Sequence, residues 1–178
     1  MIIMSCACHK VKKLEINDYV VYKNSGVCII TDIRKECLVN NEEREYYVLT
    51  SVRDDRSVVH VPVESELAGK IHHVITKDEI EESIAMAKKY NLHWPEELKK
   101  RTEYFREIID SGSYSSILML LKSLQEKKRE LTARKKKLYS GDERNLMAAE
   151  KLVSEEFAFA LGIDKKQALE YVYGEFWG

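Results

Sequence analysis

Residues that interrupt regular structure are scarce in this chain. Only 2 of its 178 residues are proline and 7 are glycine, which excludes collagen-like chains and disordered chains rich in proline and glycine. No stretch approaches the roughly 18 to 20 consecutive apolar residues of a membrane-spanning helix, so we expect no membrane partner. With 44% hydrophobic and 33% charged residues, the composition fits one or two folded domains with a hydrophobic core.

Motifs of nucleotide binding and of catalysis are also missing. Neither of the phosphate-binding patterns G-x-x-x-x-G-K-[ST] and G-x-G-x-x-G occurs, and neither does G-x-S-x-G or H-E-x-x-H. The five histidines do not share the face of one predicted helix. We therefore predict that the protein is not an enzyme and that it uses no cofactor.

Cysteine occurs four times, at positions 6, 8, 28 and 37. The chain begins MIIMSCACHKVKK, with apolar residues ahead of the charged ones, the reverse of the order in a secretory signal peptide. We therefore expect reduced thiols and a cytoplasmic location. Cys6, Cys8 and His9 supply three soft ligands, but structural zinc takes four. We favour a reduced N-terminal tail and predict no metal site.

The first 75 residues alternate between apolar and polar side chains, as β-strands do. The alternation is seen in four segments: DYVVY (18–22), GVCIITDIR (26–34), EYYVLTS (45–51) and SVVHVPV (57–63). Asn40 with Asn41, and Asp54 with Asp55, separate neighbouring segments by few enough residues for hairpins. Pro62 marks an edge strand or the end of one. We predict a small antiparallel β-barrel over residues 15–75, after an N-terminal extension over residues 1–14.

From Thr76 onward the apolar residues recur with the period of an α-helix. The helix boundaries are set by local signals: a capping box of Thr76 and Glu79, Pro95 at a first helical position, residues 111–113 at a helix end, a second capping box of Ser140 and Glu143, Gly162 as a stop and Asp164 as a cap. The longest helix is expected from about Tyr114 to Leu138. The fold class is therefore α+β, with the barrel followed by an all-helical domain over residues 76–178.

Basic residues are concentrated in one segment, although the net charge of the chain is −1. Residues 122–137 hold eight lysines and arginines and two acids. On the predicted long helix, Lys122, Arg129 and Lys136 recur every seven residues on the side opposite the apolar stripe. Such a row can follow a phosphate backbone or form an ordinary solvated face, and the pattern leaves both possibilities open.

Trp94 stands directly before Pro95 in the segment NLHWPEEL (91–98). Because the residue before a proline adopts an extended backbone, the indole should lie just outside the helix that follows. Two interpretations are open. The ring either folds back over Leu92 or Leu98 as a lid on the core, or lies exposed as an aromatic wedge for nucleic-acid bases. The physical argument alone slightly favours the lid.

Several segments resemble, in order, the CarD/CdnL family of bacterial transcription regulators, whose N-terminal module is shared with the RNA-polymerase-interacting domain of the transcription-repair coupling factor. They are DYVVYKNSGVCIITDI (18–33), EYYVLTS (45–51), VVHVPVES (58–65), the tryptophan at a helix start, DSGSY (110–114) and LYSGDERNLMAAEKLVSEEFAFALG (138–162). The resemblance covers about residues 15–162.

The resemblance implies that the barrel is Tudor/SH3-like and binds the β subunit of RNA polymerase through Val58, His60, Val61 and Pro62. It also implies that the helical domain binds promoter double-stranded DNA, and that Trp94 wedges into the minor groove and stabilises the open complex. Together with the charge pattern, the expected DNA-binding residues are Trp94, Lys99, Lys100, Arg101, Lys122, Arg129 and Lys136. No catalytic activity and no cofactor come with the resemblance.

One departure from the family pattern supports an alternative function. Pro95, Glu96, Glu97 and Leu98 separate Trp94 from the basic residues, which family members carry almost directly after the tryptophan. Two acids there repel phosphate. The alternative is an RNA polymerase adaptor that acts by protein–protein contact with little DNA binding. In both cases we expect a monomer in the cytoplasm, associated with the nucleoid through RNA polymerase.

Overall fold

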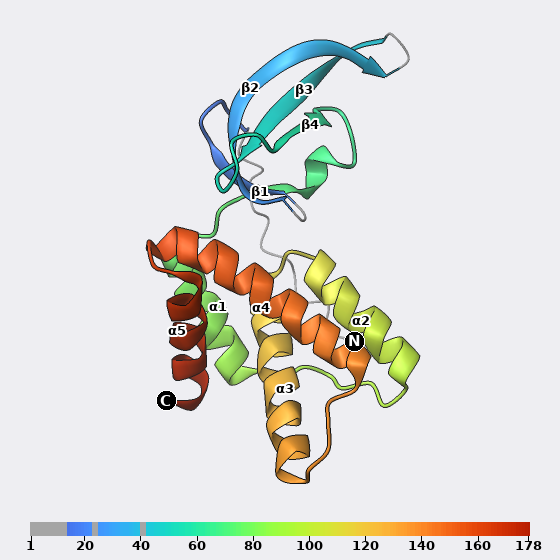
Figure 1. Cartoon of the computed structure of the whole chain (residues 1–178), viewed down its shortest axis with the longest axis vertical. Coiled ribbons are helices and arrows are strands. Elements are labelled where there is room, and N and C mark those ends of the chain that lie inside the picture. Colours follow the sequence, from blue (N-terminus) through green and yellow to red (C-terminus); the bar gives the residue numbers. More distant parts are fainter. Residues whose placement is uncertain (1–13, 23–24, 40–41) are drawn as a thin grey trace. The chain divides into compact units, whose positions relative to one another are not determined.

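The computed structural model describes residues 14–22, 25–39 and 42–178. The chain divides into two compact units, one ending at His73 and the other spanning Val74–Gly178, which we call the sheet unit and the helical unit. The described residues form a five-stranded sheet and five α-helices (Figure 1), so the predicted α+β class is confirmed. The division lies two residues before the domain boundary predicted between residues 75 and 76. None of the helices seen is long and apolar enough to cross a membrane.

The sheet unit is an antiparallel sheet with the order β4-β3-β2-β1-β5. Its strands are β1 (Tyr19–Tyr22), β2 (Gly26–Val39), β3 (Glu42–Ser51), β4 (Val58–Pro62) and β5 (Ile71–His73). The alternating segments of the sequence correspond to β1 to β4. β5 has only three residues, too few to show an alternation. The hairpin of β2 and β3 extends beyond the predicted segments. Its outer part is largely charged, and a search for alternating apolar residues does not detect strands of that composition.

The sheet is open in the described part of the chain. β4 and β5 are its two outer strands, and closure of the predicted barrel is not shown. Pro62 ends β4 on the outer edge, as predicted, where a missing N–H costs no ladder hydrogen bond. Irregular register between Ile30 and Asp32, and again between Glu36 and Val39, bends β2. The bent sheet encloses a small core whose fully buried members are Val20, Cys28, Ile30, Leu49 and Val61.

The helical unit packs five helices around one larger core. They are α1 (Lys77–Lys89), α2 (Leu98–Asp110), α3 (Tyr114–Ala133), α4 (Ser140–Leu161) and α5 (Lys165–Trp177). α4 contacts each of the other four helices, and Figure 1 shows it crossing the unit from the side of α2 to the side of α5. The predicted capping box at Thr76 and the predicted cap at Asp164 are confirmed, and Asp164 forms a capping box with Gln167. Gly162 ends α4 with a left-handed φ of 65°, as predicted.

Two predicted helix starts are wrong. α2 begins at Leu98, three residues after Pro95, and Glu97 precedes it without a side-chain cap. α4 begins with Tyr139 as its N-cap residue and has no capping box. For α4 the reason is tertiary, because Asp142 binds Arg101 and Glu143 binds Lys128. Neither acid satisfies its own helix end.

The predicted end of α3 is also wrong. The helix stops at Ala133, and Lys135 follows with a φ of 56°. The N–H of Lys135 donates to the carbonyl of Thr132 (2.9 Å) and the N–H of Lys136 donates to that of Leu131 (2.8 Å). These are the two hydrogen bonds of a Schellman motif, which usually has glycine where Lys135 stands. Lys136 therefore lies outside the helix, and the predicted seven-residue row of cations does not exist as a helical face.

We expect the substitution Lys135→Gly to stabilise the helical unit. Relief of the left-handed backbone of a residue with a Cβ is worth about 1–2 kcal/mol, and the greater flexibility of glycine in the unfolded chain offsets roughly 0.5–1 kcal/mol of it. The free energy of unfolding, measured by urea denaturation followed by circular dichroism, should rise. Lys136→Gly is the control, since it removes the same charge without relieving a left-handed φ. Equal effects of the two substitutions would contradict the prediction.

Candidate functional site

The outer strand β4 offers backbone groups to a partner. The carbonyl of Ser57 and the N–H of Val63, at its two ends, are hydrogen-bonded to β3 at 3.0 and 2.9 Å. Residues of an antiparallel strand point their backbone groups alternately toward the neighbouring strand and away from it. The backbone groups of Val58 and His60 therefore point to the open edge, and Pro62 has no N–H to offer. An incoming strand could therefore pair with the N–H and carbonyl groups of both residues.

The side chains of the predicted polymerase-binding residues lie on both faces of this strand. Val61 is fully buried in the core of the sheet unit, whereas the side chain of Val58 is 45% exposed. His60 and Pro62 are half-buried on the face opposite Val61. Val61 thus packs β4 onto the core of the sheet unit. Val58, His60 and Pro62 are the residues whose side chains a partner can reach.

His60 belongs to a polar cluster that also includes Arg34 and Glu36 of β2. Its Nδ1 lies 2.8 Å from one carboxylate oxygen of Glu36, and Nε of Arg34 donates to the other at 2.6 Å. Burial raises the pKa of Glu36, but the hydrogen bonds from Arg34 and His60 outweigh it and hold that pKa below its usual value. The ionised carboxylate fixes the orientation of His60 at the edge. Sequence reasoning missed Glu36, which lies 24 positions from His60.

Trp94 lies in the connection between α1 and α2 with its side chain half-buried. Its ring meets the fully buried Phe105 edge-on, with 5.3 Å between the centroids. The guanidinium carbon of Arg101 lies 5.0 Å from the indole centroid. The ring therefore has the position of a lid on the core. It covers Phe105 and not Leu98, whose side chain is 47% exposed.

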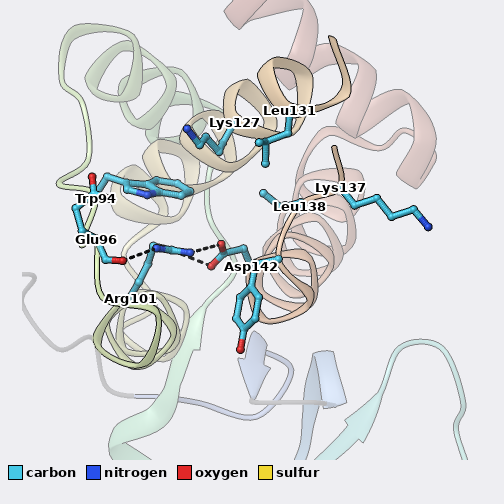
Figure 2. Close-up of a pocket in the computed structure, with 9 residues that line it drawn as sticks. Trp94, Glu96, Arg101, Lys127, Leu131, Lys137, Leu138 and Asp142 are labelled. Atoms are coloured by element: carbon cyan, nitrogen blue, oxygen red, sulfur yellow. Dashed lines mark hydrogen bonds and ion pairs between the residues drawn. The ribbon is translucent and has the colours of Figure 1, made fainter. Parts of the chain in front are cut away.

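Arg101 and Asp142 form a buried ion pair beside this ring (Figure 2). The two residues are 6% and 1% exposed. Nη2 and Nε of Arg101 donate to the two carboxylate oxygens at 2.7 and 3.1 Å, and Nη1 donates to the carbonyls of Pro95 (3.0 Å) and Glu96 (3.3 Å). The predicted role of Arg101 as a DNA contact is at odds with this burial, since its charge is already compensated inside the protein.

The ion pair forms one wall of a cavity of about 450 Å³. Figure 2 shows the Trp94 ring and Lys127 beside this cavity and the Lys137 side chain directed away from them. Its other lining residues are Glu96, Leu131, Leu138 and Tyr139. Lys127 is paired with Glu130 at 2.9 Å. The cavity thus combines the aromatic rings of Trp94 and Tyr139, apolar side chains, the compensated charges of the ion pairs and the cation of Lys137, which is unpaired among the described residues.

The other predicted DNA-binding residues of α2 lie on the surface. Lys99 and Lys100 are both exposed. Lys100 is paired with Glu97 at 2.6 Å, so one of the acids that follow Trp94 already compensates a neighbouring cation. Such an exposed pair contributes little to stability and can exchange for a phosphate.

Two residues of the predicted basic row interact within the helical unit instead. Nζ of Lys122 donates to the carbonyl of Ala87, in the last turn of α1, at 2.9 Å, where a cation is favoured. The guanidinium of Arg129 lies 4.0 Å from the ring centroid of Trp177. Both placements depend on neighbouring helices, which the angular argument from one helix could not include.

The segment between α3 and α4 is the most basic exposed part of the helical unit. Arg134, Lys135, Lys136 and Lys137 are consecutive and exposed, and we call residues 134–137 the basic loop. Arg134 is paired with Glu130 at 3.2 Å. The three lysines form no ion pair with another residue among those the structure describes. Of the predicted row, only Lys136 lies here.

The buried ion pair was missed, although the sequence holds a signal for it. Arg101 precedes Phe105 by four residues and Ile108 by seven, so it lies on the apolar stripe of α2. Asp142 has the same relation to Leu146 and Ala149 on α4. A charged residue in the buried stripe of each of two helices indicates an ion pair between them.

Comparison with known proteins identifies the class of the sheet unit. Residues 14–75 match the family model of the CarD-like/TRCF RID domain. The resemblance predicted from the sequence is thus confirmed over residues 14–75, and the sheet unit is a CarD-like domain of the RNA-polymerase-interacting type, which implies RNA polymerase as a partner. The match does not extend into the helical unit. No curated protein matches the chain.

A metal centre is not found in the part of the chain that the structure describes, where no group of three or more histidine, cysteine or acidic side chains could hold an ion. Cys6, Cys8 and His9 lie outside the described residues. Cys28 is buried and Cys37 is exposed, and both are free thiols.

Proposed function

We propose that this protein is a non-enzymatic transcription regulator that binds RNA polymerase through its sheet unit and promoter DNA through its helical unit. The observation that carries the proposal is the match of residues 14–75 to a polymerase-interacting domain class, in a unit whose outer strand β4 is open to a partner. In this proposal the protein is a cytoplasmic monomer held near the nucleoid by the polymerase.

The polymerase contact we propose is strand addition to β4 by the β subunit. Strand addition obtains affinity from main-chain hydrogen bonds and specificity from flanking side chains. The outward backbone groups of Val58 and His60 would supply the main-chain hydrogen bonds. The imidazole of His60, fixed by Glu36 at 2.8 Å, would supply the specificity.

The DNA contact we propose centres on the basic loop, Lys99 and Trp94. Three lysines without an ion-pair partner among the described residues are suited to phosphate groups, whose neutralisation releases counterions. Trp94 borders the cavity described above, and we propose that its ring leaves Phe105 and wedges into the minor groove at the edge of the melted region. The wedge would then stabilise the open complex.

A second function, the adaptor with little DNA binding, is favoured by one observation. Trp94 is packed on Phe105, and Arg101 beside it is ion-paired. If the ring stays there, neither Trp94 nor Arg101 is available to DNA. The adaptor shares the polymerase contact with the first proposal and differs in the DNA contact.

We expect two substitutions in β4 to weaken binding to the polymerase β subunit. Val58→Pro removes one outward N–H and leaves the hydrogen bonds to β3 in place, so the loss of one hydrogen bond of about 1 kcal/mol should raise Kd by roughly fivefold. His60→Glu places a second carboxylate beside Glu36, and we expect a loss of at least about tenfold. Isothermal titration calorimetry with the β subunit measures both.

The control for these variants is Leu38→Glu, which adds the same charge at an exposed position of β2. Circular dichroism establishes that each variant keeps its sheet. An unchanged Kd for both β4 variants would show that the polymerase uses another part of the sheet unit.

DNA binding should depend steeply on salt, and the basic loop should account for much of that dependence. Each phosphate contact contributes about 0.9 to the slope of log K against log salt concentration. Replacing Lys135, Lys136 and Lys137 by glutamine should therefore lower the slope by up to about 3. The double variant Lys122→Gln with Arg129→Gln, which changes cations already engaged within the protein, should keep the slope. The reverse result would place the phosphate contact on α3.

Trp94→Ala tests the wedge against the lid. Inserting a ring costs a few kcal/mol of base unstacking in intact duplex and less where the strands are already separating. The variant should therefore shorten the lifetime of the open promoter complex, measured after addition of a competitor, while binding to the polymerase and to duplex DNA changes little. If the lifetime is unchanged and only the free energy of unfolding falls, Trp94 is a lid and the adaptor function stands.

A further inference from the structure

We propose that Arg101, held in place by Asp142, is the positioning residue of Trp94, fixing both the ring and the backbone that follows it. The biological meaning of this inference rests on the proposed function of Trp94. The contacts that support it are independent of that function. Sequence reasoning assigned Arg101 to DNA, and the structure assigns it to the tryptophan.

The first part of the argument is the backbone. Nη1 of Arg101 donates to the carbonyls of Pro95 and Glu96 at 3.0 and 3.3 Å, and the backbone N–H of Arg101 donates to the carbonyl of Glu97 at 2.9 Å. One residue thus binds three consecutive carbonyls directly after Trp94. No side chain caps the N–H groups at the start of α2, and the turn before the helix is instead fixed through its carbonyls by Arg101.

The second part is the ring. The guanidinium carbon of Arg101 lies 5.0 Å from the Trp94 centroid, a cation–π distance, and the Phe105 centroid lies at 5.3 Å. Arg101 and Phe105 are four residues apart on α2, so they meet the ring from successive turns of one helix. The side chain of Trp94 is held by α2 while part of it still borders the cavity.

The third part is the requirement for arginine and for its partner. A guanidinium has five donors in a rigid plane. Here they serve Asp142 twice and two carbonyls once each, while the plane stays near the indole. A lysine has three donors on one nitrogen and cannot hold all these partners. Asp142 keeps the guanidinium in place, because moving Arg101 out to a phosphate would leave a buried carboxylate without a counter-charge.

A consequence follows for any movement of Trp94. The ring can leave Phe105 by rotation of its own side chain, while the carbonyls of residues 95–97 stay bound to Arg101. The wedge would thus move on a fixed backbone, and the loop would require no rearrangement. This limits the entropy lost when the ring binds.

The experiment uses the full chain with Trp177→Phe, which leaves Trp94 as the only tryptophan. Acrylamide quenching of its fluorescence then reports the exposure of the ring. We expect Arg101→Lys to raise the quenching constant by roughly twofold, since the planar cover of the ring is lost. Asp142→Asn, which keeps the shape of the partner and removes its charge, should change it in the same direction. Arg106→Lys, at an exposed position of the same helix, should leave it unchanged.

A second measurement separates positioning from general stability. If Arg101 acts on the wedge by fixing the backbone that follows Trp94, Arg101→Lys should shorten the open-complex lifetime in the native background but not in the Trp94→Ala background. A variant that only weakens the fold would shorten it in both. If Arg101→Lys lowers the helical content measured by circular dichroism, Asp142→Asn replaces it in this comparison of the two backgrounds.

The outcomes distinguish this inference from the proposed function. Unchanged quenching in both Arg101→Lys and Asp142→Asn overturns the positioning role, whatever the DNA results are. Increased quenching together with an open-complex lifetime that does not respond to Trp94→Ala keeps the positioning role and overturns the wedge. Equal shortening of the lifetime in both backgrounds overturns the inference as well.

Discussion

The ion pair of Arg101 and Asp142 is the constraint on which the geometry of the helical unit depends. Two charges that are 6% and 1% exposed each lose several kcal/mol of hydration on burial, and their attraction offsets this loss only in good geometry with further hydrogen bonds. Both conditions are met here, with two bonds between the partners and two from Arg101 to backbone carbonyls. The pair therefore fixes α2 against the first turn of α4, and with it the place of Trp94.

A second buried acid acts at the other end of α4. Glu156 is 2% exposed, and it accepts hydrogen bonds from the N–H of Ile75 (2.7 Å) and from the hydroxyl of Tyr114. Burial and this carboxylate raise the pKa of Tyr114 well above its usual value, so the hydroxyl remains a donor at all ordinary pH values. The first turn of α4 thus holds α2 through Asp142. Near its other end, α4 holds the segment before α1 and the start of α3 through Glu156, and Figure 1 shows α4 crossing the unit between these places.

What the sequence predicted correctly in this protein is local. The strands β1 to β4, the capping box at Thr76, the cap at Asp164 and the stop at Gly162 each depend on residues a few positions apart. Most of the errors are tertiary, and one is local. Lys122 and Arg129 were placed by the angles of one helix, but a carbonyl of α1 and the ring of Trp177 determine where they lie. The end of α3 escaped prediction because lysine stands where a Schellman motif usually has glycine.

The packing of Trp94 against Phe105 also bears on the selectivity of a wedge. Leaving the core costs the ring an aromatic contact of about 0.5–1.5 kcal/mol and a cation–π contact of about 0.5–2 kcal/mol. Stacking on one unpaired base would return roughly 1–3 kcal/mol, which comes close to balancing this cost. Insertion into intact duplex requires a few kcal/mol of unstacking in addition, which these contacts do not supply. In the proposed function, a ring stored on the core would therefore respond to DNA that is already opening, and an unpacked ring would discriminate less.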